Sequence, residues 1–319
     1  MPSLPAGSLS DVWEAGSVIA VVCGDIHLSH TKPFYRSPEP DWYEAQDRYL
    51  SILRDITENY SCPLIVCGDL FDRWAVNPEL ITFAMRSLPP TVFAIPGQHD
   101  LPNHDLDQMG RSGYGVLSEC ERIFDMSDGI CVVPRDCEGV RLYPFPWGNR
   151  MKSIDYDLPD DLLNVAIAHQ YVHNGDGTKH VEADDDDTVD FQRRNAKGFD
   201  AAFFGDNHIP FESGRFFNCG SLMTRHASDR HHDHGFFIIH DTGQIQRIII
   251  PEDDIQCVNI DDVMKMVESG SDLGLDITQV GAALAALWAD GLDFVSALNQ
   301  FMKDNDVADD VAKLSLIHI

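Results

Sequence analysis

Four short apolar runs along the chain each end at a polar turn. Unbroken apolar runs of this length predict β-strands that are buried on both faces. The runs cover residues 18–23, 64–67, 92–95 and 201–204. The turns after them begin with Gly24-Asp25, Gly68-Asp69, Pro96-Gly97 and Gly205-Asp206. The pattern therefore predicts buried strands whose ends carry polar loops.

Amphipathic helices are predicted between the first of these strands. Over residues 41–60, apolar side chains recur every three or four positions, which places them on one face of a helix. Asn77-Pro78 offers an N-cap followed by proline at the first helical position, and a second apolar stripe follows over 80–88. This alternation of strand, helix and strand is typical of a layered α/β fold.

The second half of the chain is predicted to be rich in strands. Short β-prone runs occur at 165–168, 215–217, 235–239 and 244–250, and Asp241-Thr242-Gly243 predicts a hairpin turn between the last two. We expect these strands to be largely antiparallel. Residues after 250 show helical periodicity. The expected organisation is a domain over 1–250 and a helical extension over 251–319.

Composition excludes several classes of protein. The chain has 319 residues with 52 acidic and 23 basic side chains, a net charge of −29, so a basic nucleic-acid footprint is absent. This charge argues against loose coating of DNA, although salt of about 1 M would screen repulsion from phosphate to within about 3 Å. No apolar stretch is long enough to span a membrane, and the first residues lack a secretory signal, so we expect a cytoplasmic protein.

Residues that can bind metal follow the ends of the predicted strands. In layered α/β folds these ends converge on one crevice, so the side chains are expected to meet there. Carboxylates and imidazoles without thiolates favour Mn, Mg, Fe or Zn, and two such ions about 3.5–4 Å apart suit the hydrolysis of phosphate esters. The residues near strand ends are Asp25, His27, Asp69, Gln98, His99, Asp100, His169, Asp206 and His208.

The order of these motifs resembles that of the calcineurin-like metallophosphoesterases. The resemblance covers about residues 17–250 and is greatest to the SbcD-type DNA-repair exonuclease branch, including its bacteriophage members. It implies a four-layer α/β/β/α metallophosphoesterase sandwich with a short helical C-terminal extension. The motifs are Gly24-Asp25-Ile26-His27, Gly68-Asp69-Leu70-Phe71-Asp72-Arg73, Gly97-Gln98-His99-Asp100, Ala168-His169, Gly205-Asp206-Asn207-His208 and, as a structural turn, Asn218-Cys219-Gly220-Ser221.

The resemblance also implies a role for each residue. His99 would protonate the leaving oxygen or stabilise its charge, and Asp100 would orient the His99 ring. Asp72 and Arg73 would support the ligands or contact phosphate rather than bind metal. Independently of the resemblance, His104 follows the catalytic turn closely and is expected to line the substrate groove. A first metal ion would be held by Asp25, His27, Asp69 and His208, and a second by Asp69, Gln98, His169 and Asp206, with Asp69 as the bridge.

Two positions depart from the family pattern, and both concern the second ion. Gln98 stands where the family usually has Asn, and Asp206 where it usually has His. Glutamine keeps the amide oxygen, whereas aspartate replaces a neutral nitrogen by an anionic oxygen, which makes the site harder and favours Mn or Mg. We therefore expect two divalent ions, Mn above Mg, Fe or Zn. The alternative is a degraded second site.

The expected function is hydrolysis of phosphodiester bonds in DNA, as an exonuclease or endonuclease. Two alternatives stay open: a small-molecule phosphomonoesterase or cyclic-nucleotide phosphodiesterase, and a catalytically weak nucleic-acid-binding subunit. Expected partners are DNA, an SbcC-like ATPase subunit and a second copy of the chain, with no membrane. Residues 314–319 resemble translated sequencing-adapter read-through, so the extension is expected to be a truncated capping or partner-docking region.

Aromatic side chains near the motifs allow a further interpretation. Tyr35, Trp42, Tyr114 and Trp147 could stack on nucleobases. Aromatic residues in a domain of this size more often belong to the core, and we expect these to do so.

Overall fold

The computed structural model divides the chain into two compact units. The first unit contains both sheets and every predicted site residue, and is formed by residues 1–32, 41–224 and 232–255. The second contains the 3₁₀ helices η2 (Phe34–Arg36) and η7 (Ala227–His231). The structure describes residues 16–135, 138–152, 158–159, 161–175, 177–179, 187–252 and 254–259. Most of the predicted extension over 251–319 lies outside these residues, so that division stays a prediction.

The first sheet contains the predicted N-terminal strands. Its order is β12-β11-β1-β2-β3-β4, with β1 to β4 parallel and β11 antiparallel to both of its neighbours. The Gly243 N–H donates to the His240 carbonyl, which confirms the predicted hairpin turn. The strands are β1 (Val18–Cys23), β2 (Leu64–Val66), β3 (Val92–Ala94), β4 (Phe124–Asp125), β11 (Gly235–His240) and β12 (Ile245–Ile249).

The second sheet is largely parallel, so the expected antiparallel arrangement was wrong for it. Its order is β5-β6-β7-β8-β10-β9, and β6, β7, β8 and β10 run parallel. The reason is the length of the connections: helix α5 (Val189–Asn195) lies in the long link between β7 and β8, and such links allow a parallel crossover. The strands are β5 (Cys131–Arg135), β6 (Glu138–Phe145), β7 (Leu163–His169), β8 (Ala201–Gly205), β9 (Phe211–Ser213) and β10 (Phe216–Asn218).

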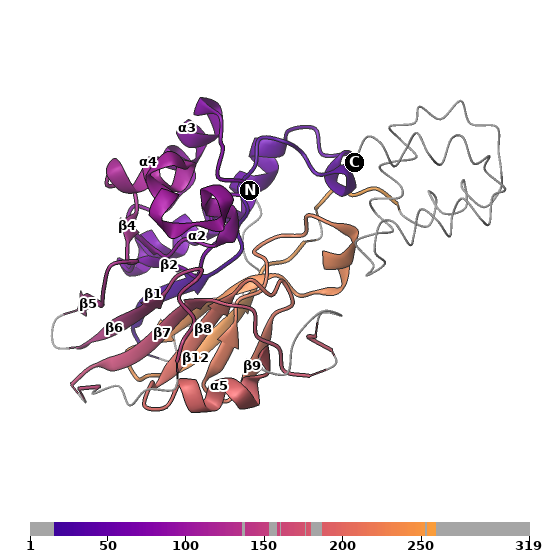
Figure 1. Cartoon of the computed structure of the whole chain (residues 1–319). Helices are drawn as coiled ribbons and strands as arrows, with labels where there is room; N and C mark the ends of the chain where they lie inside the picture. Colours follow the sequence, from indigo (N-terminus) through magenta and orange to yellow (C-terminus); the bar gives the residue numbers. More distant parts are fainter. Residues whose placement is uncertain are drawn as a thin grey trace, which may run out of the picture. The chain divides into compact units, whose positions relative to one another are not determined.

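Alternating strand residues face two different cores, which produces the layers of the first unit. Ile167 and Phe203 pack between the sheets, whereas their neighbours Ala168 and Phe204 pack with α5 on the outer face of the second sheet. Three helices cover the outer face of the first sheet (Figure 1). The predicted four-layer α/β/β/α sandwich is confirmed. These helices are α2 (Trp42–Tyr60), α3 (Pro78–Ser87) and α4 (Gly113–Glu119).

Side-chain caps fix where the two predicted helices begin. The Glu44 N–H donates to the Asp41 carboxylate at 3.0 Å, and the Leu80 N–H donates to the Asn77 side chain at 2.8 Å. Each cap supplies an acceptor to an N–H group that has no partner within the helix. Among the helices that the structure describes, none combines the length and apolar character needed to cross a bilayer.

Candidate metal centre

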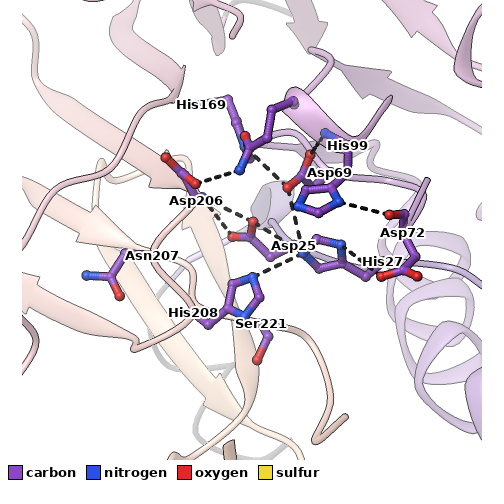
Figure 2. A network of polar contacts seen from close by, with 12 residues as sticks. Asp25, His27, Asp69, Asp72, His99, His169, Asp206, Asn207, His208 and Ser221 are labelled. Atoms are coloured by element: carbon purple, nitrogen blue, oxygen red, sulfur yellow. Dashed lines mark hydrogen bonds and ion pairs between the residues drawn. The ribbon is translucent and has the colours of Figure 1, made fainter. Parts of the chain in front are cut away.

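The predicted metal-binding side chains converge from loops of both sheets. The loops after β1, β2 and β3 come from the first sheet, and those after β7 and β8 come from the second. Figure 2 shows most of these side chains pointing toward one another. The convergence predicted from the strand ends is confirmed for Asp25, His27, Asp69, Gln98, His169, Asp206 and His208.

Four of these residues hold a left-handed backbone conformation. Asp25, His27, Asp69 and Asp206 have φ values of 47°, 50°, 51° and 81°. Residues other than glycine rarely adopt this conformation, and it persists only where the surrounding structure enforces it. Such strain gathers at functional sites, because it aims side chains in directions that ordinary turns do not allow.

Two glycines permit the close packing of the loops. A β-carbon at Gly68 would overlap the His169 ring, and one at Gly97 would overlap the Asp69 carboxylate. Gly68 also has φ +97°, a conformation that side chains disfavour. The glycines in the Gly-Asp and Gly-Gln motifs are therefore required by the approach of neighbouring loops.

One potential ligand set is formed by Asp25, His27 and His208. The Nε2 atoms of His27 and His208 are 3.1 Å apart, and the His27 Nε2 lies 4.0 Å from the Asp25 Oδ1. One ligand atom from each of the three residues lies within 4.8 Å of the others. Two imidazoles and a carboxylate are a donor set that Mn, Fe and Zn accept.

A second set is formed by Asp25, Asp69 and His169, so Asp25 belongs to both of these sets, and a third set contains His27, Asp72 and His99. The His169 Nε2 lies 3.5 Å from the Asp69 Oδ2 and 2.6 Å from the Gln98 Oε1. The His169 Nδ1 lies 2.7 Å from the Cys67 carbonyl oxygen. A carbonyl oxygen only accepts, so Nδ1 carries a proton and directs Nε2 into the site. This contact could not be predicted from sequence, because any residue type supplies a carbonyl.

Asp69, a member of the second set, also approaches the first set. Its Oδ2 is 3.7 Å from the His27 Nε2 and 3.5 Å from the His169 Nε2. This oxygen is buried, and within the described part of the chain it accepts no hydrogen bond. Buried carboxylate oxygens normally have a hydrogen-bond donor or a cation. The position suits the bridging role that the resemblance implies.

The two residues that depart from the family pattern contact each other. The Gln98 Nε2 donates to the Asp206 Oδ1 at 2.7 Å, and this leaves the amide oxygen directed at His169. The Asp206 N–H donates in turn to the Asp25 carboxylate at 3.1 Å. The side chain of Gln98, longer than the usual asparagine, therefore reaches the carboxylate of Asp206, which stands in place of the usual histidine.

The buried carboxylates require positive charge. Burial raises the pKa of the Asp25 carboxyl well above its usual range, and the nearby Asp69 and Asp206 add to this, although His169 opposes it. Burial opposes protonation of His169, but the carboxylates of Asp69, Asp25 and Asp206 outweigh it and raise the pKa of the ring to about 10. The Asp69 pKa is lowered, because His169 and His99 outweigh its burial.

Residues 20–210 match the model of the calcineurin-like phosphoesterases. The chain belongs to this family. The match covers most of β1, strands β2 to β8 and all of the converging loops described above. A comparison with curated proteins found no similar sequence.

Solved structures similar to this calcineurin-like phosphoesterase are distant relatives. The phosphopantetheinyl hydrolase PptH of Mycobacterium tuberculosis is 15% identical, with 74% of this chain and 98% of that chain covered and a TM-score of 0.40. YfkN of Bacillus subtilis is 14% identical, with 63% and 80% covered and a TM-score of 0.35. A metallophosphoesterase of Sphaerobacter thermophilus is 12% identical, with 84% and 99% covered and a TM-score of 0.35.

The donor set of this calcineurin-like phosphoesterase fits divalent metal ions. Aspartate, histidine and glutamine supply oxygen and nitrogen atoms, and no cysteine belongs to the possible ligand sets found among the described residues. Cations would meet the demand of Asp25 and Asp69 for positive charge, which a protonated His169 otherwise supplies in part. The candidate ligands are therefore consistent with a centre for more than one ion.

His99 lies at the rim of the centre, held by two contacts. Its backbone N–H donates to the Asp69 Oδ1 at 2.9 Å, and its ring Nδ1 lies 2.9 Å from the Asp72 carbonyl oxygen. The Asp72 carboxylate lies 3.9 Å from the His27 Nδ1. Asp72 therefore faces both histidines, with its carbonyl toward one and its carboxylate toward the other (Figure 2).

Asp100 does not orient His99, so this expectation was wrong. Its Oδ1 accepts from the Phe71 N–H at 2.9 Å, and its Oδ2 accepts from the N–H groups of Leu70 and Gly97 at 3.1 and 3.0 Å. Asp100 is fully buried, and its two oxygens tie the loop after β2 to the loop after β3. Its role in this structure is to fix the loops that carry Asp69 and His99.

The Asn218-Cys219-Gly220-Ser221 turn fixes the loop that carries His208. The Asn218 Nδ2 donates to the carbonyls of Asn207 and Ile209, and the Ser221 N–H donates to the His208 carbonyl. These bonds hold the backbone on both sides of His208. The turn thus supports the loop that carries this candidate ligand.

The two predicted substrate contacts, Arg73 and His104, lie outside the ligand sets. The Arg73 side chain is 79% exposed, with its Nε 3.8 Å from the Asp72 carboxylate. His104 is also exposed, and its ring contacts that of Trp147 at a centroid distance of 6.1 Å. Their roles in binding substrate stay predictions.

Replacing the central carboxylate tests the metal assignment. We expect Asp69→Asn to bind less than half of the metal that the wild type binds, because the Asp69 carboxylate belongs to the second ligand set and approaches the first. Added Mn²⁺ should raise the Tm of the wild type and leave that of the variant nearly unchanged. Metal content by elemental analysis and thermal unfolding are the measurements. Asp55→Asn, on the exposed face of α2, is the control, and equal metal content in Asp69→Asn and wild type would contradict the bridge.

Removing the Asp100 carboxylate tests its structural role. Asp100→Ala leaves the N–H groups of Leu70, Phe71 and Gly97 without their acceptor, at about 1–3 kcal/mol each. We expect a loss of at least about 3 kcal/mol in the free energy of unfolding, measured by urea denaturation. Asp107→Ala, an exposed position, should change it by less than about 0.5 kcal/mol. If Asp100→Ala were as stable as the wild type, the structural role of Asp100 would be contradicted.

Proposed function

We propose that this chain is a metal-dependent phosphodiesterase that cleaves DNA, as an exonuclease or endonuclease. The observation that carries the proposal is the placement of exposed cationic and imidazole groups beside the candidate ligands. Arg73 follows Asp72 and is 79% exposed. His99 and His104 are exposed on the loops after β3. A polyanion needs contacts to phosphates beyond the one that is cleaved.

The motifs of the chain support the same substrate. The Gly-Asp-Leu-Phe-Asp turn at 68–72 and the Gly-Gln-His-Asp turn at 97–100 resemble those of the SbcD-type exonuclease branch. An SbcC-like ATPase subunit, a second copy of the chain and a cytoplasmic location stay predictions on this ground.

His99 is the residue best placed to move a proton. Because the Asp72 carbonyl only accepts, the ring Nδ1 donates to it in either protonation state, and Nε2 is the atom that gains or loses a proton. Divalent ions held by the candidate ligands would supply charge neutralisation for the phosphoryl oxygens and acidify a water molecule. His99 then donates its proton to the leaving oxygen, and Asp100 keeps its loop in place.

A second candidate is a phosphomonoesterase or cyclic-nucleotide phosphodiesterase that acts on small molecules. The net charge of −29 favours it, because a long polyanion is repelled by an acidic surface at low salt. A third candidate, a catalytically weak nucleic-acid-binding subunit, requires that Gln98 and Asp206 mark a degraded second site. Their mutual hydrogen bond at 2.7 Å argues for a rebuilt site rather than a degraded one.

The deciding experiment compares substrates in the presence of Mn²⁺, Mg²⁺ or Zn²⁺. We expect shortened products from labelled single- or double-stranded DNA, with Mn²⁺ the best activator, together with hydrolysis of bis(p-nitrophenyl) phosphate. Release of phosphate from p-nitrophenyl phosphate with intact DNA would support the small-molecule candidate instead. Zinc as the best activator would contradict the preference for a hard cation.

A substitution at the rim separates an enzyme from a binding protein. His99→Ala is expected to lower kcat by about 10²–10⁴-fold, because it removes the proton donor. Its affinity for DNA, measured by fluorescence anisotropy, should change little. His231→Ala, at another exposed histidine, should retain the wild-type rate. A wild type that binds DNA without any turnover would establish the binding subunit.

A further inference from the structure

We propose that Trp147 and His104 form a stacking subsite for a nucleobase beside the candidate metal centre. The inference rests on the proposed nuclease function and specifies its substrate further. The Trp147 ring lies 6.2 Å from that of His169, between centroids, and 6.1 Å from that of His104. Trp147 therefore contacts the candidate ligand His169 on one side and the exposed His104 on the other.

Trp147 is fixed to the loop that carries His99. The backbone N–H of Trp147 donates to the Pro96 carbonyl at 3.1 Å, and Pro96 directly precedes the Gly-Gln-His-Asp turn. The Asn149 N–H donates to the Pro146 carbonyl at 2.9 Å and closes the turn around the tryptophan. These bonds tie the backbone of Trp147 to the loop whose groups are expected to perform hydrolysis.

The surroundings of Trp147 differ from those of a core residue. It is half-buried, and in the part of the chain that the structure describes its indole N–H donates to no acceptor. Buried tryptophans usually find such an acceptor. Trp42, by comparison, is buried and its Nε1 donates to the Ser29 hydroxyl at 3.1 Å. The expectation that Trp147 belongs to the core was therefore wrong.

The loop that holds His104 is strained. Asn103 and His104 are consecutive residues with left-handed backbones, with φ values of 54° and 57°. The His104 N–H donates to the Leu101 carbonyl at 3.1 Å, which holds the turn while its ring stays exposed. An exposed histidine has no packing reason to keep such a backbone, and strain of this kind is retained where a side chain must be aimed.

The His104 and Trp147 rings meet edge to face, at an interplanar angle of 89°, so each presents a separate face beside the candidate ligands. Such a face suits the base of a nucleotide whose phosphate would be bound at the centre. Every nucleobase offers a π-face, so stacking on tryptophan or histidine binds nucleotides with little dependence on sequence. A base within a duplex is already stacked on its neighbours, and extracting it costs free energy. The subsite therefore favours an unpaired nucleotide, at a strand end or in single-stranded DNA, next to the phosphate that is cleaved.

A binding experiment tests the subsite without turnover. In the presence of Ca²⁺, we expect the wild type to bind deoxyadenosine 5′-monophosphate about tenfold more tightly than 2-deoxyribose 5-phosphate, measured by titration calorimetry. Trp147→Ala should lose this preference, and Trp147→Phe, which keeps a π-face, should retain most of it. Phe124→Ala, which removes a 53% exposed ring from β4, should behave as the wild type. Circular dichroism confirms that each variant folds.

The same variants on DNA distinguish failure of the subsite from failure of the nuclease proposal. Wild type should cleave single-stranded DNA about tenfold faster, in kcat/KM, beside a normal nucleotide than beside an abasic one, and Trp147→Ala should lose that ratio. Equal binding of the two probes by the wild type, or a preference kept in Trp147→Ala, overturns the subsite. Base-dependent binding that is lost in Trp147→Ala, with no cleavage of any DNA, supports the subsite and overturns the nuclease.

Discussion

The structure of this centre depends on carboxylates buried close to one another. Asp25 and Asp69 are 0% and 1% exposed, and Asp206 donates its N–H to the first of them. Negative groups at such depth are unfavourable unless positive charge and hydrogen-bond donors surround them. The left-handed turns, the close-packed glycines and the carbonyl that fixes His169 all serve to hold donors and imidazoles against these carboxylates.

The sandwich is the means by which these groups come from distant parts of the chain. The first sheet presents Asp25 and Asp69, and the second presents His169 and Asp206, at strand ends that meet across the core between the sheets. Phe203 packs there against Phe217 and Phe237, at centroid distances of 5.1 and 5.6 Å. Parallel neighbours matter in both sheets, because they bring the carboxyl ends of several strands to one edge.

Helix starts and strand ends could be predicted from the sequence, because they depend on interactions between residues that are close together in the chain. Asn77 before Pro78 predicted a helix start, and apolar runs before Gly-Asp predicted strand ends, since capping and burial act within a few residues. The direction of the strands in the second sheet was missed, because it depends on connections and partners far along the chain. Asp100 was misassigned for the same reason: its neighbour in sequence is His99, whereas its carboxylate binds N–H groups about thirty positions away. Trp147 follows a strand end too, but no motif marks it.

The bond between Gln98 and Asp206 joins loops that belong to different sheets. It connects the two sheets at their strand ends, so the distance between the candidate ligands of the two sheets depends on how the sheets pack. Substitutions of buried residues far from the centre, such as Phe203, would therefore alter cation affinity although these residues contact no candidate ligand. Among related proteins we expect Gln98 and Asp206 to be substituted together rather than singly.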